Sequence, residues 1–95
     1  MYKRPVVETA KLIDVYAQEW LRITNLDSAK PKDLMPYLIE KRVFNHDHRE
    51  GLPLRAILRQ LDQIGELGLI RGLNVERKST NRLWSIKRIE TGESN

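Results

Sequence analysis

The chain has 95 residues, enough for one domain with a modest core and too few for a large enclosed active site as well. It has no cysteine, which excludes disulfides and thiolate metal sites, and no apolar run near the roughly 20 residues of a membrane helix. Its 17 basic and 13 acidic residues give a net charge of +4, which admits a polyanionic partner without requiring one.

These properties predict a soluble domain over residues 1–89 and a disordered tail over residues 90–95. The N-terminal segment MYKRPVVETAK lacks the apolar stretch of a signal peptide, so we expect a cytoplasmic location.

Residues 5–24 have the apolar period of a helix, with Pro5 suited to its first turn. One face is apolar and broad, and consists of Val6, Ala10, Leu12, Ile13, Tyr16, Ala17, Trp20, Leu21 and Ile23. The opposite, solvent face is expected to carry Glu8, Lys11, Gln18 and Arg22. Because the apolar arc is wide, this helix is also a candidate homodimer surface.

A polar break at residues 25–28 precedes a second helix, about 31–41, with Pro31 near its first position. Its inner face is expected to hold Leu34, Tyr37 and Leu38. Pro36 lacks a backbone N–H, so it should either kink this helix or delay its start.

Residues 42–52 have turn chemistry, with Val43 and Phe44 expected to pin the loop to the core. His46, Asp47 and His48 form the one cluster with metal-ligand chemistry. Their spacing matches no strong motif, and polar loops often contain such runs by chance. We therefore predict no metal and no cofactor.

A third helix is expected over 53–65, ended by Gly65 and Gly68. Its inner face is apolar and consists of Leu54, Ile57, Leu58, Leu61 and Ile64. Its outer face carries Arg55, Arg59 and Gln63, with Gln60 beside them.

Residues 71–88 are predicted to form a β-hairpin around the loop 78–81. This register pairs Val75 with Trp84 and Leu73 with Ile86 on one apolar face. The segment holds six basic residues and one acid, which is the densest positive charge in the chain. The basic residues of the tip are expected to be free to meet a partner; they are Arg77, Lys78 and Arg82.

Three helices followed by a hairpin predict a mainly α fold with a C-terminal β-hairpin. Over residues 5–89 this order resembles the winged helix-turn-helix superfamily. The resemblance rests on PLRAILRQLDQIGELGLI as the third-helix segment and RGLNVERKSTNRLWSIKR as the wing. One departure is the long connection, about 42–52, where a compact helix-turn-helix has three or four residues. It is either an insertion or partly helical.

The resemblance implies a non-enzymatic module that binds double-stranded DNA, such as a small transcriptional regulator. The third helix would enter the major groove with Arg55, Arg59, Gln60 and Gln63. The wing would contact the backbone through Arg77, Lys78 and Arg82. No nucleophile and base occur together, so no catalysis is expected.

The alternative is a protein-interaction or dimerisation module on the same scaffold. A continuous positive strip joining the third helix to the wing would favour DNA. A strip interrupted by Asp62 and Glu66 would favour the alternative.

Overall fold

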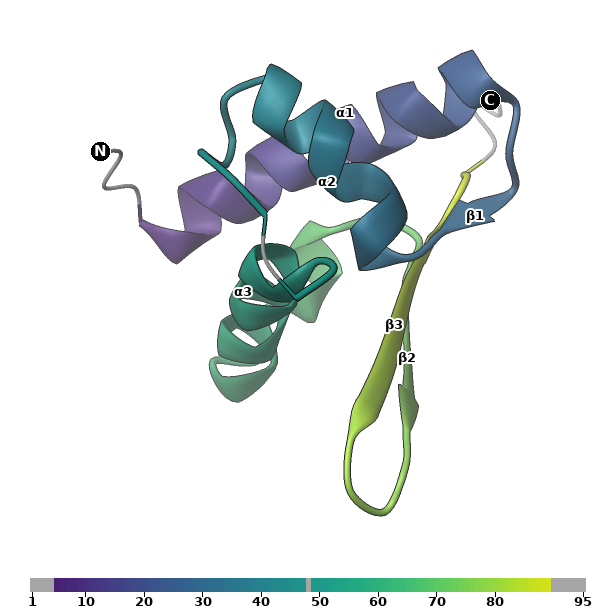
Figure 1. The fold of residues 1–95 in the computed structure, drawn as a ribbon. Helices are drawn as coiled ribbons and strands as arrows, with labels where there is room; N and C mark the ends of the chain where they lie inside the picture. The colour runs from purple at the N-terminus through teal and green to yellow at the C-terminus, as the bar shows by residue number, and fades with distance from the viewer. Residues whose placement is uncertain (1–4, 48, 90–95) are drawn as a thin grey trace.

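The structure is a computed structural model, and it describes residues 5–47 and 49–89. Three helices, α1 (Val6–Thr24), α2 (Pro31–Glu40) and α3 (Leu52–Gln63), pack together around the core. A short 3₁₀ turn, η1 (Leu67–Leu69), leads from α3 into the C-terminal hairpin, β2 (Leu73–Arg77) and β3 (Arg82–Lys87). Figure 1 shows that α3 and the hairpin project to the same side of α1. The predicted tail, residues 90–95, lies outside the described residues.

Helix α1 begins after Pro5, as expected, and runs the length of the core. Its end is fixed by Asn25, whose φ of 59° is left-handed, and by a bond of 3.1 Å from the Leu26 N–H to the Leu21 carbonyl. Its buried apolar side chains are Ala10, Ile13, Ala17 and Leu21. Ile23, predicted on the same arc, is exposed.

Gln18 is fully buried, so its predicted place on the solvent face of α1 is wrong. Its side-chain Nε2 donates to the carbonyls of Lys87 at 2.9 Å and Arg71 at 3.3 Å. Its Oε1 accepts from the Ile89 N–H at 3.0 Å. A buried amide is tolerated where its hydrogen-bonding groups are satisfied. This one connects α1 to the base of the hairpin, next to the start of β2 and at the end of β3.

Helix α2 starts at Pro31, so Pro36 does not delay its start, and the helix continues through Pro36 to Glu40. The Lys30 N–H, just before the helix, donates to Oδ2 of Asp33 at 3.0 Å. Leu34, Met35 and Leu38 are buried in the core.

The long connection to α3 folds back against α2. Val43 is buried and Phe44 packs partly on the core, as predicted, and the described residues of the loop contain no helix. Asp47 Oδ1 accepts the Gly51 N–H at 2.9 Å. An added Cβ at Gly51 would lie 2.9 Å from the Lys32 backbone nitrogen, so the loop ends directly on the first turn of α2. The long loop therefore does not displace α3, which packs on α1 and α2.

Helix α3 begins one residue earlier than predicted and ends two residues earlier, at Gln63. Gly65, with a φ of 74°, lets the chain turn there, and the Glu66 N–H donates to the Leu61 carbonyl at 2.8 Å. Leu54, Leu58 and Leu61 form its buried stripe, while Ile64 is exposed.

The hairpin has the predicted register, with Val75 opposite Trp84 and Leu73 opposite Ile86. The prediction of a hairpin alone is incomplete, because β1 (Ser28–Ala29) pairs antiparallel with the end of β3 and makes a three-stranded sheet in the order β1-β3-β2. Since β1 has only two residues, its pairing covers β3 at Ile86 and Lys87 and stops short of Trp84. Among the described residues, no strand pairs with β3 from Arg82 to Trp84 on the side of β1, and this edge faces α3.

Candidate functional site

A cleft of about 330 Å³ separates α3 from the hairpin. Helix α3 contributes Arg55 and Arg59, and the hairpin contributes residues 80–84. A second hollow of about 210 Å³ shares Arg55 and Arg82 with it and extends to the start of α2. We call the two together the basic cleft, because their lining includes five cationic side chains and one carboxylate, that of Glu50. The cations are Lys30, Lys32, Arg55, Arg59 and Arg82.

Arg55 is held at the base of this cleft by the strained end of the loop. Its Nη2 donates to the Arg49 carbonyl at 2.7 Å. Arg49 is the first of three successive residues in the left-handed conformation, followed by Glu50 and Gly51. Their φ values are 54°, 52° and 97°. The Arg55 Nε is buried and has no hydrogen-bond partner. The guanidinium of Arg55 has the Arg49 carbonyl as its one acceptor and no paired carboxylate among the described residues, so its positive charge contributes to the cleft.

The four predicted groove residues of α3 separate into two groups. Arg55 and Arg59 line the cleft, whereas Gln60 and Gln63 are exposed on the helix and line neither of its hollows. The helix therefore presents guanidinium groups toward the hairpin and amide groups to solvent beside the cleft.

The arginines of the hairpin are paired, so the expectation that they are free is wrong. Arg77 donates from Nη1 and Nη2 to the two carboxylate oxygens of Asp62 at 3.0 and 3.1 Å. Arg82 Nε lies 3.3 Å from Asp62 Oδ2, and Lys78 Nζ lies 3.1 Å from Glu76 Oε2. The hydrogen bonds from Arg77 hold the pKa of Asp62 below its usual range, so this carboxylate is ionised at neutral pH.

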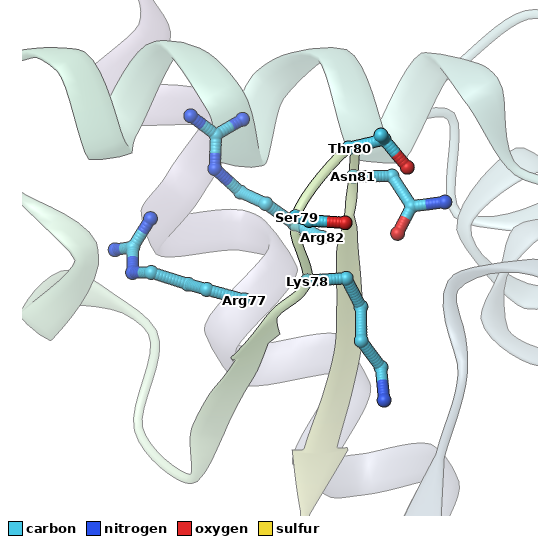
Figure 2. Close-up of a pocket in the computed structure, with 6 residues that line it drawn as sticks. All are labelled: Arg77, Lys78, Ser79, Thr80, Asn81 and Arg82. Carbon is cyan, nitrogen blue, oxygen red and sulfur yellow. The ribbon is translucent and has the colours of Figure 1, made fainter.

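The register itself explains this pairing. Side chains alternate along a strand, so Arg77 and Arg82 continue the inner face that Val75 and Trp84 begin. Figure 2 shows both arginines extending to the same side of the hairpin, while Lys78 and Asn81 extend to the other side. The sequence was sufficient to place Arg77 and Arg82 on this face. It also indicated the acceptor, because Asp62 follows Arg55 and Arg59 at helical spacing and so lies on the same face of the third helix.

Two further arginines of the hairpin segment were not assigned to binding, and both have partners inside the molecule. Arg71 Nε pairs with Asp14 at 3.0 Å, and Arg88 Nη2 lies 3.3 Å from Asp27. The sequence interpretation missed Lys30 and Lys32, because Lys30 lies between the polar break and the second helix and Lys32 lies in the first turn of that helix. Their proximity to Arg55 depends on how the loop returns to α2.

The other sequence signals carry no assigned chemistry. Asp47 uses a carboxylate oxygen to hold the Gly51 N–H, and His48 lies outside the described residues. Over residues 5–47 and 49–89, no three His, Cys, Asp or Glu side chains cluster as metal ligands would. Within that same part of the chain, no helix has the length and apolar character to cross a membrane.

Comparison with protein-family models, curated proteins and solved structures found no match to this chain.

Proposed function

We propose that this protein is a non-enzymatic module that binds double-stranded DNA in the manner of a winged helix, consistent with a small transcriptional regulator. The observation that carries the proposal is the basic cleft between α3 and the hairpin, which is lined by five cations and one carboxylate. One of the five, Arg82, is paired with Asp62 outside the lining. Clefts with walls of one charge sign concentrate the field of that charge and attract polyanions. Duplex DNA is the polyanion whose dimensions suit an exposed helix beside a projecting hairpin.

The exposed face of α3 and the cations around the cleft would have different tasks. Arg59, Gln60 and Gln63 are exposed along α3, and arginine and glutamine form paired hydrogen bonds with guanine and adenine edges in the major groove. Lys30 and Lys32 at the start of α2, with Lys78 and Thr80 at the hairpin tip, suit phosphate contacts that set the orientation of the protein.

Asp62 does not divide this cleft. Its carboxylate is turned to Arg77 and Arg82, and it does not line either hollow of the basic cleft. The positive strip runs from Arg59 through Arg55 to the start of α2, and Glu50 is the one carboxylate that lines it. Between α3 and the wing, Asp62 stands against Arg77 and Arg82, which is the arrangement expected of the docking alternative. The proposal of DNA binding therefore rests on the basic cleft and not on a positive strip that continues to the wing.

Replacing Arg59 with alanine should weaken binding to duplex DNA about tenfold at low salt, since one contact of an arginine to a base or phosphate contributes at this level. Arg22→Ala is the matched control, because it removes the same charge from an exposed site on α1. The control should change the affinity less than twofold. Fluorescence anisotropy with a labelled duplex measures both, and equal losses would contradict the assignment of the cleft.

A second candidate function, self-association through α1, is favoured by two exposed apolar side chains, one in the last turn of that helix and one just beyond its end. Ile23 and Leu26 are 68% and 46% exposed. If they form a dimer interface, Ile23→Glu should convert a dimer to a monomer in sedimentation experiments. A monomeric wild-type protein at high concentration would exclude this function.

A further inference from the structure

The tip of the hairpin surrounds a hollow of about 330 Å³ with the composition of an anion site (Figure 2). Its lining holds three cations, two hydroxyl groups and one amide, and includes no carboxylate. The residues are Arg77, Lys78, Ser79, Thr80, Asn81 and Arg82. Arg77 and Arg82 extend to one side of the hairpin and Lys78 and Asn81 to the other, so the two arginines are the donors that could meet one phosphate together.

The arginines of this hollow already hold an anion, and that anion belongs to the protein. The Asp62 carboxylate accepts both Nη groups of Arg77 at 3.0 and 3.1 Å and faces Arg82 Nε at 3.3 Å. This forked geometry is the one that arginine also offers to two phosphate oxygens. A single carboxylate therefore occupies donors of two arginines that a phosphate would also need.

The two arginines remain accessible to a competing ligand. The side chains of Arg77 and Arg82 are 54% and 37% exposed, whereas that of Asp62 is 18% exposed. Ion pairs with partners this exposed are screened by water and salt, so they stabilise the fold little. Exchange of one anion for another at Arg77 and Arg82 therefore requires no opening of the core.

We propose that Asp62 is an internal competitor for nucleic-acid phosphate, which holds Arg77 and Arg82 until a phosphate of a bound duplex displaces it. This inference rests on the proposed function and identifies a regulatory feature of the same surface. On this account Arg77 and Arg82 contribute to DNA binding only to the extent that phosphate displaces the Asp62 carboxylate from them. Lys78 and Asn81, on the other side of the hairpin, stay outside this competition (Figure 2).

The direct test compares Asp62→Asn with the native protein in duplex binding. The variant keeps the size of the side chain but releases both arginines, so the affinity should rise about tenfold at low salt, with a salt slope steeper by about 0.9–1.8. Asp14→Asn is the matched control, because it removes the same charge from an arginine pair with Arg71 outside the basic cleft. It should shift the affinity less than twofold. Equal or weaker binding by Asp62→Asn, with an unchanged melting temperature, would overturn the proposal.

Arg77→Ala separates competition from a structural role of the pair. In the native protein it should lower the affinity less than twofold, because Asp62 already occupies Arg77. In the Asp62→Asn background the same replacement should lower the affinity several-fold. If both backgrounds respond equally, Asp62 does not govern the arginine and the proposal fails.

A titration with inorganic tripolyphosphate distinguishes this inference from the proposed function. The Nε–H signal of Arg82, followed by NMR, should report binding several-fold tighter in Asp62→Asn than in the native protein. If no duplex binds to any variant, the proposed function is wrong, and the tripolyphosphate result still decides the role of Asp62. Identical titrations in the two proteins would overturn that role.

Discussion

Replacing Gly72 with alanine should destabilise the protein by about 2–5 kcal/mol. Gly72 has a φ of 76°, a left-handed conformation that costs an L-residue about 1–2 kcal/mol. An added Cβ would also lie 2.2 Å from the Lys87 carbonyl oxygen, so the strands must separate at the base of the hairpin. Such overpacking costs about 1–3 kcal/mol more. The midpoint of urea unfolding measures the loss.

Two other glycines of the chain separate these contributions. Gly65 also has a left-handed φ, of 74°, but an added Cβ there meets nothing within 4 Å. Gly65→Ala should therefore cost only the conformational share, about 1–2 kcal/mol. Gly68 has neither a left-handed φ nor a neighbour within 4 Å, so Gly68→Ala should be close to neutral. If Gly72→Ala and Gly65→Ala destabilise equally, the close approach to Lys87 does not limit the hairpin.

Replacing Gln18 with methionine should destabilise the protein by about 3 kcal/mol or more. Methionine has a similar length and flexibility, so the packing volume is nearly kept. The change leaves the carbonyls of Lys87 and Arg71 and the N–H of Ile89 without their side-chain partner. A buried polar group without a partner costs about 1–3 kcal/mol.

The control for Gln18 lies on the same helix. Lys11 is exposed on α1, so Lys11→Met should change the unfolding free energy by no more than about 0.5 kcal/mol. Both proteins are compared by urea unfolding. A Gln18→Met variant within about 1 kcal/mol of the native protein would mean that water replaces the lost bonds and that Gln18 does not fix the hairpin to α1.

Gln18 and Gly72 lie next to each other at the base of the hairpin, so we expect the position of the hairpin to depend on both. An added Cβ at Gly72 would lie 3.3 Å from Gln18 Nε2, the atom that donates to Lys87 and Arg71. The base of the hairpin is thus packed against α1, and α1 also packs on α3. Both walls of the basic cleft are therefore supported by α1, and the pairs of Asp62 with Arg77 and Arg82 connect the walls directly.

The register of the hairpin could be predicted because two independent patterns agree. The turn residues fix where the strands reverse, and the apolar side chains then fall opposite one another on one face. The same rule also places Arg77 and Arg82 on the inner face, a consequence that the expectation of free arginines ignored. The helices were predictable for a similar reason, since their buried apolar residues repeat at helical spacing.

Features that depend on distant partners could not be predicted. Strand β1 has two residues, too few to show an alternating pattern, and exists because Ala29 lies against Ile86. Gln18 has the appearance of an ordinary polar helix residue, and its partners lie 53 to 71 positions away in the chain. Lys30 and Lys32 join the cleft only because the loop before α3 returns to the first turn of α2.

The salt dependence of duplex binding by the wild-type protein tests the central claim most directly. If three to five of the cations in the basic cleft neutralise phosphates, the logarithm of the binding constant should fall linearly with the logarithm of the salt concentration, with a slope of about −2.7 to −4.5. Absence of binding at low salt, or a slope near zero, would contradict the assignment of the basic cleft to duplex DNA.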